Sequence, residues 1–328
     1  MTHLVTTRTP LRIGLFGGGT DLPQISDQIG GAVINFSIQQ YVYVTVKKHS
    51  GLFHEKYRLQ YSSTEMVDSV NHIKNDIIRE CLLFFEIDCP LFINTISDLP
   101  SSSGLGGSSS FTVGLVNALN HLFQLGIASS AIAETAFQIE RSIKGNSVGR
   151  QDAYAASVGG FNLFEFNSKN SISPVTNSKL LSDLLPCTRL YWTQVQRSAA
   201  QILSEQISHS SCRLDSYREL RDIAVNAYKA ITSCHSFGIC DFAQYLNKNR
   251  EIKYKLSDSI VNPAILSLEN QLFENGALAT KLIGAGGGGF VLSIFPDETT
   301  LSSSLDNLSY ISFPVMLDCH GTQVLQSF

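Results

Sequence analysis

A strand, a turn rich in glycine and serine, and a helix follow one another within residues 91–125, and this junction constrains the fold more than any other stretch. The apolar run from Leu91 to Ile96 has the length of a strand, and apolar side chains recur at helical spacing from Phe111 to Leu125. The turn between them contains Pro100, Ser101, Ser102, Ser103, Gly104, Leu105, Gly106, Gly107, Ser108 and Ser109. A glycine-rich turn at a helix amino terminus exposes backbone N–H groups at the positive end of the helix dipole, so we interpret it as a phosphate site.

An ordinary structural turn is the alternative interpretation, because Ser is a preferred helix N-cap. The turn is also not a Walker A loop, since no Gly-Lys-Ser/Thr follows its glycines. Two further glycine clusters, at 9–23 and 281–290, favour the functional interpretation. Three such clusters far apart in the sequence indicate parts of one site.

The order of the three clusters resembles that of the GHMP small-molecule kinases, a family that includes galactokinase and mevalonate kinase. The resemblance runs from about Thr9 to Gly289. It implies ATP as phosphoryl donor, Mg2+, and a two-domain fold with the site in the cleft between the domains. It also implies a ribosomal protein S5 domain 2-like domain over residues 1–187, which binds ATP, and a ferredoxin-like domain over residues 188–328.

Within that family, the stretch Arg-Thr-Pro-Leu-Arg-Ile followed by Gly-Gly-Gly-Thr-Asp-Leu-Pro resembles D-glycero-D-manno-heptose 7-phosphate kinases. Residues 58–62, 196–199 and 255–260 are similar to the same group. The first cluster lacks the Glu-His of galactokinases, which argues against galactose. The resemblance thus implies phosphorylation of the heptose 7-phosphate at C1, to give the 1,7-bisphosphate for nucleotide-activated heptose and surface polysaccharide.

Composition limits the classes of protein that fit. The chain of 328 residues, with 43% hydrophobic residues and a formal net charge of −4, is long enough for two ordinary globular domains. It has no Lys/Arg run, so we expect no nucleic-acid partner. The most apolar window, Cys81 to Ile96, is broken by Glu86 and Asp88, so we expect no membrane span. Seven scattered cysteines without a CxxC pair predict reduced thiols and a cytoplasmic location.

Helices and strands alternate without regular βαβ repetition, which predicts an α+β fold. We expect strands at Ala32 to Ile38, Tyr41 to Val46, Leu190 to Val195, and a final pair at Val291 to Phe295 and Val315 to Asp318. We expect helices at Asn75 to Phe85, Ser108 to Leu125, Ser129 to Arg141 with Ser129 or Ser130 as cap, Tyr217 to Cys234, Asp241 to Lys255 and Pro263 to Asn275, and a surface loop at Ser168 to Asn177.

The family resemblance assigns Mg2+ to Ser108 and Glu140. Ser108 matches the family's metal-ligating serine, while Gly107 replaces the serine that usually precedes it. One hydroxyl and one carboxylate suffice, because Mg2+ keeps several waters and binds the phosphates as well. The alternative for Glu140 is a helix-surface charge that pairs with Lys144 at i,i+4.

The resemblance also assigns Asp152 as the base for the acceptor hydroxyl and Arg12 as the cation that faces it. Gly18, Gly19, Thr20 and Asp21 then match the family's sugar-binding loop. The alternatives from the residues alone are a dipole-complementing Asp152 at a helix amino terminus, a strand-edge surface Arg12, and a simple turn around Asp21.

A substrate that already carries a phosphate needs a second anion site, for which Arg197, Lys144 and Arg150 are the cationic candidates. The turn at residues 100–109 is called the phosphate loop below. The loop from Gly284 to Gly289 is expected to pack on it, with Gly286 and Gly287 near the substrate; a simple hairpin is the alternative.

Two other functions remain open at this stage. One is a kinase that acts on the anomeric hydroxyl of another sugar, such as fucose. The other is a catalytically inactive sugar sensor, against which the joint presence of Arg12, Ser108, Glu140 and Asp152 speaks. A homodimer is left open as well.

Overall fold

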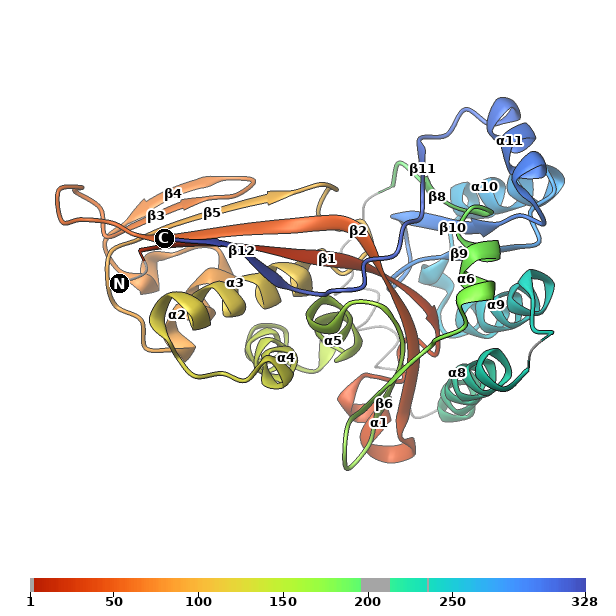
Figure 1. Ribbon diagram of the computed structural model, residues 1–328, viewed down its shortest axis with the longest axis horizontal. Coiled ribbons are helices and arrows are strands. Elements are labelled where there is room, and N and C mark those ends of the chain that lie inside the picture. Colours follow the sequence, from red (N-terminus) through yellow and green to blue (C-terminus); the bar gives the residue numbers. More distant parts are fainter. Residues whose placement is uncertain (1–2, 196–212, 235) are drawn as a thin grey trace.

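The computed structural model describes residues 3–195, 213–234 and 236–328. Two β-sheets, each with helices packed against it, form two lobes that lie side by side (Figure 1). The described chain thus mixes helices with largely antiparallel sheets, which confirms the predicted α+β class. In these described parts, no helix combines the length and the apolar character that a membrane crossing requires.

The larger sheet has the strand order β12-β1-β2-β5-β3-β4, with β6 paired to β2 and β7 paired to β6. Its strands are β1 (Leu4–Phe16), β2 (Gly31–Lys48), β3 (Tyr57–Gln60), β4 (Thr64–Val67), β5 (Leu91–Ser97), β6 (Phe161–Phe166), β7 (Ser171–Pro174) and β12 (Gln323–Ser327). All these pairs are antiparallel except the parallel pair of β3 with β5.

Four helices, α2 to α5, lie together on one face of this sheet (Figure 1). The helices of this lobe are α1 (Pro23–Ile29), α2 (Asp76–Phe84), α3 (Gly107–Phe123), α4 (Ile132–Lys144) and α5 (Gln151–Val158), with single 3-10 turns at Val70–His72, Ser129–Ala131 and Gly145–Ser147. Helix α3 packs on β1, β2, α4 and α5 and buries most of its side chains. Its amino terminus is therefore held rigidly at the edge of the lobe.

The smaller sheet is antiparallel throughout, in the order β11-β8-β10-β9. Its strands are β8 (Thr188–Trp192), β9 (Ala279–Leu282), β10 (Phe290–Ile294) and β11 (Ser312–Pro314), and its helices are α6 (Ser178–Leu184), α8 (Leu214–Ser233), α9 (Ile239–Tyr254), α10 (Pro263–Glu274) and α11 (Glu298–Asn307), with a 3-10 turn at Asp258–Ile260. Helices α8 and α9 also pack against β1 of the other lobe.

The end of the chain crosses back to the first lobe. After β11, Leu317 forms a bridge with Ile38 of β2, and β12 then pairs with β1. The division at residues 187/188 stays a prediction, but the last strand lies in the larger sheet although the sequence placed it with the second domain.

Three secondary-structure predictions are wrong in detail. The two strands expected at 32–38 and 41–46 are one strand, β2, whose register against β1 shifts between Pro10 and Leu11 and so leaves a local irregularity near Gln39. The expected surface loop at 168–177 contains β7, an edge strand that pairs with β6 alone among the described strands. The expected strand at 315–318 does not form, because the strand in this region, β11, ends at Pro314, and β8 lies between it and β10.

The expected cap of α4 is also wrong. Ser129 and Ser130 form a 3-10 turn with Ala131, and Ala131 occupies the N-cap position of α4.

Candidate active site

A cavity of about 600 Å³ opens between the two lobes. Its walls come from the end of β1, the loop before α3, the segment from α4 to α5, and the elements α9 and β9 of the smaller lobe. The lining residues are Arg12, Gly14, Gly18, Gly19, Asp21, Leu22, Ser102, Ser103, Gly104, Gly106, Gly107, Ser108, Ser109, Glu140, Lys144, Ser147, Val148, Gly149, Gln151, Asp152, Asn249, Lys253, Lys281, Leu282, Gly284 and Ala285. The three glycine clusters of the sequence therefore meet at one cavity.

The loop before α3 turns its backbone toward this cavity. Gly104 and Gly106 have positive φ angles of 82° and 78°, a conformation that glycine adopts without strain. Leu105 between them is fully buried, and its carbonyl accepts a hydrogen bond of 3.0 Å from Arg12 N. Among the described residues no side chain caps the amino end of α3, and the residues of its first turn line the cavity, so N–H groups at the positive end of the helix dipole are available there. Pro100 and Ser101 are exposed and lie outside the cavity wall.

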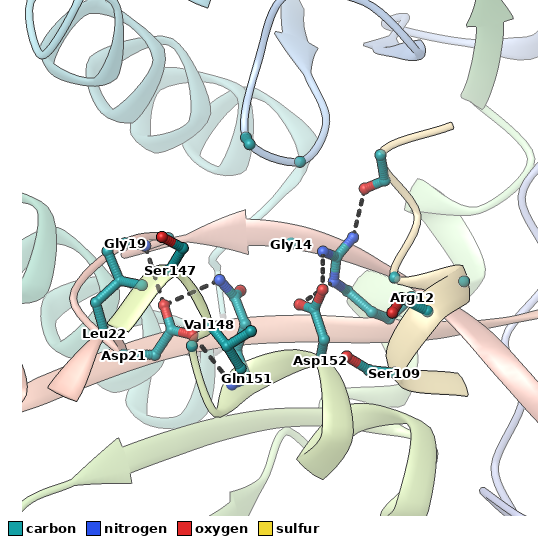
Figure 2. A pocket seen from close by; sticks show the side chains of 18 of the residues that line it. Arg12, Gly14, Gly19, Asp21, Leu22, Ser109, Ser147, Val148, Gln151 and Asp152 are labelled. Atoms are coloured by element: carbon teal, nitrogen blue, oxygen red, sulfur yellow. Dashed lines mark hydrogen bonds and ion pairs between the residues drawn. The ribbon is translucent and has the colours of Figure 1, made fainter. Parts of the chain in front are cut away.

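Arg12 and Asp152 form a forked ion pair beside the loop (Figure 2). Arg12 Nε donates to Asp152 Oδ1 at 2.7 Å and Nη2 donates to Oδ2 at 2.6 Å, while Nη1 donates to the carbonyl of Gly104 at 2.6 Å. The Arg12 side chain is 6% exposed and the Asp152 side chain is 24% exposed. The carboxylate is thus the accessible member, and the arginine fixes both its orientation and the phosphate loop.

The surface alternative for Arg12 is wrong, because β1 pairs with β2 at this position, the Arg12 N–H donates to Leu105 of the loop before α3, and the side chain is buried. Asp152 does lie in the first turn of α5, as the dipole interpretation requires. It also faces the cavity, so the two interpretations hold together.

Glu140 joins the last turns of α4 to the first turn of α3. Its carboxylate accepts hydrogen bonds from Ser108 Oγ at 2.8 Å and from Ser109 Oγ at 2.5 Å, and Lys144 Nζ lies 3.3 Å away. The expected i,i+4 pair with Lys144 therefore exists, but the Glu140 side chain is only 2% exposed and is not a helix-surface charge. Ser109, which the sequence placed only in the cradle, shares the contact.

Asp21 is a buried residue of the loop that follows β1 (Figure 2). It accepts hydrogen bonds from Gly19 N at 3.1 Å, Gln151 N at 3.1 Å and Gln151 Nε2 at 3.0 Å. Burial raises the pKa of the Asp21 carboxyl, the backbone bond from Gln151 opposes this, and the charge of Asp152 adds to it. Asp21 thereby ties the loop after β1 to the start of α5, the helix that carries Asp152.

Gly18 and Gly19 line the cavity next to Asp21, whereas Thr20 does not. The Thr20 hydroxyl donates to the carbonyls of Gly17 and Ala32, at 2.8 and 3.0 Å, and accepts from Ala32 N. This side chain holds the turn in shape within the protein.

The glycines of the third cluster pack against other backbone. A Cβ at Gly284 would lie 2.7 Å from Gly104 Cα, and one at Gly289 would lie 2.3 Å from the carbonyl oxygen of Ser103. Gly286 and Gly287 lie against Ile260 instead and do not line the cavity. The loop thus contacts the phosphate loop through its ends, while the two glycines expected near the substrate pack within the smaller lobe.

Three lining residues from the smaller lobe were missed by the sequence interpretation. Asn249 and Lys253 lie on α9, and Lys281 lies on β9; all three are buried. On α9 they follow Phe242 and Leu246 at helical spacing, so polar residues on an otherwise apolar helix face were the available signal.

The electrostatics of these lysines are unusual. Burial lowers the pKa of Lys253 to about 8, although the charge of Asp21 opposes the shift. Burial, and then the charges of Lys253 and Arg12, lower the pKa of Lys281 well below its usual value. Lys281 Nζ donates to the carbonyls of Gly14, at 2.8 Å, and Leu15.

The three cations expected to hold a second phosphate have different positions. Arg197 lies outside the described residues. Arg150 donates to Ser26 Oγ at 3.3 Å, lies over the ring of Phe137 and is absent from the cavity wall. Lys144 lines the cavity beside the phosphate loop, where its Nζ donates to Ser108 Oγ at 2.7 Å.

Comparison with known proteins finds relatives for both lobes of the chain. The sequence profiles of the GHMP kinases N terminal domain and the GHMP kinases C terminal domain match residues 69–160 and 239–309. The chain is 33% identical over 313 residues to a D-glycero-alpha-D-manno-heptose 7-phosphate kinase of Campylobacter jejuni, which covers 90% of each chain. It is 26% identical over 340 residues to an L-fucokinase/L-fucose-1-P guanylyltransferase of Bacteroides fragilis, covering 90% of this chain and 35% of that one.

A solved structure shows the same fold over almost the whole length. The crystal structure of a D-glycero-D-manno-heptose 1-phosphate kinase from Bacteroides thetaiotaomicron superposes with a TM-score of 0.78 at 23% identity, covering 98% of this chain and 99% of that one. The cavity that gathers all three glycine clusters, together with a 33% identical relative over 90% of the chain, shows that this protein belongs to the GHMP kinase family.

Proposed function

We propose that this kinase transfers the γ-phosphoryl group of ATP to the C1 hydroxyl of D-glycero-D-manno-heptose 7-phosphate and releases the 1,7-bisphosphate. The acceptor rests on the 33% identity to the Campylobacter jejuni enzyme over 90% of both chains. The chemistry rests on one geometric observation, the forked Arg12–Asp152 pair at the point where the phosphate loop meets the cavity. Because ATP is the donor, we place the reaction in the cytoplasm. That the protein forms a homodimer stays a prediction.

In this proposal the nucleotide phosphates bind at the amino end of α3. Backbone N–H groups and the helix dipole attract the anion there, and Lys144 adds a positive charge at the same edge. Gly104 and Gly106 allow close approach of the phosphate oxygens, because they carry no side chain.

The donor set beside this loop fits Mg2+. Ser108 offers a hydroxyl oxygen and Glu140 a carboxylate oxygen 2.8 Å from it, and oxygen ligands of this kind are those that Mg2+ takes. Among the described residues no group of three or more His, Cys, Asp and Glu side chains could hold a metal by itself, so the phosphates and water would supply the other ligands. When bound, the metal would neutralise charge on the phosphate oxygens.

Asp152 is the proposed acceptor base. Arg12 occupies one lone pair on each carboxylate oxygen, and the remaining lone pairs can accept the proton of the C1 hydroxyl. The hydroxyl oxygen forms the new bond to the γ-phosphorus, the bond from that phosphorus to the bridging oxygen breaks, and ADP leaves. Asp21 lies buried at the other side of the cavity floor and positions α5 through Gln151.

The test is ADP release with ATP and Mg2+ over a panel of acceptors: the heptose 7-phosphate, the free heptose, fucose, galactose and mevalonate. We expect strong preference for the heptose 7-phosphate, with the product phosphate located at C1 by NMR. If fucose alone is phosphorylated, the proposed acceptor is wrong, but the protein is still a sugar kinase. If no acceptor causes ADP release, the catalytically inactive sugar sensor is favoured.

A further inference from the structure

Two buried lysines, Lys253 and Lys281, lie in the wall of the cavity that the smaller lobe contributes. The charges of two other cations, Lys253 and Arg12, lower the pKa of Lys281. Among the described residues no carboxylate forms an ion pair with Lys281. Its ammonium group bonds instead to the carbonyls of Gly14 and Leu15. Burial and these cations disfavour the charged form of Lys281, and an anion bound at this wall would favour it again, so the wall is suited to an anionic ligand.

A buried hydrogen-bond donor adjoins these cations. The Asn249 side chain is 1% exposed; its Oδ1 accepts from Gly17 N at 2.9 Å, while its Nδ2 has no hydrogen-bond partner within the described chain. Asn249 lines the cavity one helical turn before Lys253. An unsatisfied buried N–H group at a cavity wall indicates a ligand that accepts from it.

Lys253 lies against the loop after β1 that contains Gly18 and Gly19. Its Nζ donates to the carbonyl of Gly18 at 3.2 Å, and a Cβ at Gly19 would come within 3.3 Å of it. Gly19, with φ of 101°, thus leaves the room that a side chain would fill. In Figure 2, Gly19 and Asp21 lie at one side of the cavity and the Arg12–Asp152 pair at the other, with Gln151 between them.

We propose that Lys253 and Asn249 bind the phosphate ester of the acceptor, at the end of the cavity opposite the Arg12–Asp152 pair. This inference rests on the proposed function, because it assumes an acceptor whose C1 hydroxyl lies at Asp152. In the proposed function the nucleotide phosphates bind at the loop before α3, which lines the cavity together with Lys144, so the two anions would occupy separate ends. The charges of Lys253 and Arg12 both act on Lys281, so an anion at either end would favour its charged form.

The first test measures kcat/KM for the heptose 7-phosphate and for the free heptose. Lys253→Met should raise the KM for the 7-phosphate roughly 10- to 100-fold, the range for loss of a charged hydrogen bond, so the ratio of kcat/KM for the 7-phosphate to that for the free heptose should fall. Lys253→Arg should restore most of the preference. Lys248→Met, which removes an exposed lysine from the same helix, is the matched control and should change neither value.

Asn249→Asp gives a second variant of the same shape. Its carboxylate can still accept from Gly17 N, but the free donor becomes a negative oxygen that repels phosphate. It should raise the 7-phosphate KM at least as much as Lys253→Met. Thermal unfolding midpoints near wild type would show that both variants are folded.

The pH profile supplies a readout that a merely structural lysine would not move. The groups near Lys253 are Asp21 after β1, Lys281 on β9, and Tyr217 of α8, which lies with Lys253 against Gly19. Beyond these, the charge of Arg12 acts on Lys281, and that of Arg213, the residue before α8, acts on Tyr217. Because Lys253 loses its charge as pH rises through about 8, the 7-phosphate KM should rise above that pH, by up to about tenfold per unit. In Lys253→Met this rise should disappear.

Three results would contradict the assignment. If the wild type prefers the 7-phosphate and both variants keep that preference, the phosphate does not bind at Lys253 and Asn249, while the proposed function stands. If Arg197→Met alone abolishes the preference, the phosphate site belongs to Arg197. If the wild type turns over both heptoses equally, the proposed acceptor fails, and the phosphate site with it.

Discussion

At the scale of single residues, the site depends on charges held in fixed pairs. Arg12 orients Asp152 through two bonds and the phosphate loop through a third, so one buried side chain aligns base and donor site. A bidentate guanidinium does this better than an ammonium group, because its fork is planar and rigid.

Asp152→Asn should lower kcat by two to four orders of magnitude, the range typical of a positioned general base. The amide keeps the shape of the side chain but cannot take a proton, and the nucleotide Kd should stay within about twofold of wild type. Steady-state kinetics and calorimetric titration with ATP measure the two quantities. Near-normal kcat would mean that Asp152 only positions Arg12.

Glu140→Gln should raise the Mg2+ concentration for half-maximal activity by about tenfold or more, because the buried carboxylate charge is lost. Activity titrations with Mg2+ at saturating ATP measure this shift. Glu134→Gln on the same helix, where the carboxylate accepts from Tyr154 Oη away from the cavity, is the control. An unchanged Mg2+ dependence would leave Glu140 with only its structural bonds to Ser108 and Ser109.

At the scale of elements, two glycine loops meet backbone to backbone. Gly284 approaches Gly104 more closely than any side chain would allow, and Gly289 does the same at Ser103. The loop from the smaller lobe therefore supports the phosphate loop from behind.

Gly284→Ala should separate these loops. Its φ of 89° strains alanine, and the Cβ would lie 2.7 Å from Gly104 Cα, so we expect a loss of roughly 2–4 kcal/mol in the free energy of unfolding. The KM for ATP should rise with it. Denaturant unfolding and steady-state kinetics provide the measurements.

Gly126→Ala separates backbone strain from packing. Gly126 also has a positive φ, of 74°, but an added Cβ meets nothing within 4 Å. It should cost about 1 kcal/mol and leave the KM for ATP unchanged. Equal effects of the two variants would contradict a packing role for Gly284.

At the scale of the whole molecule, the chain returns to its first lobe after it completes the second. Asp318 N donates to the carbonyl of Ser37, and the Asp318 carbonyl accepts from Gly160 N just after α5. Strand β12 then covers the edge of β1. The last residues thus stabilise both β1 and the helix that carries Asp152.

Removal of residues 323–328 should lower the free energy of unfolding by roughly 2–4 kcal/mol, because several backbone hydrogen bonds of β1 lose their partners. Thermal and denaturant unfolding measure the loss. Leu325→Ser, which alters a half-exposed side chain and keeps the strand backbone, should cost less than 1 kcal/mol. A truncated protein as stable as wild type would show that β12 is dispensable.

Local sequence determined much of this protein. The strand at 91–97, the helix from 107 and the loop between them follow from apolar periodicity and glycine, which act over a few residues. Three glycine clusters in one order were enough to indicate a shared site. Helices such as α9 and α10 could be predicted to within a few residues for the same reason.

Only the tertiary structure decided which charges face the cavity. Arg12 is buried because β2 pairs with it on one side and the loop before α3 bonds to it on the other, through Gly104 and Leu105, and no local pattern carries those contacts. Asn249, Lys253 and Lys281 reach the cavity because α9 and β9 pack against the end of β1, more than 200 residues earlier in the chain. Burial and charge of a side chain depend on such distant contacts, whereas helix and strand formation depends mainly on near neighbours.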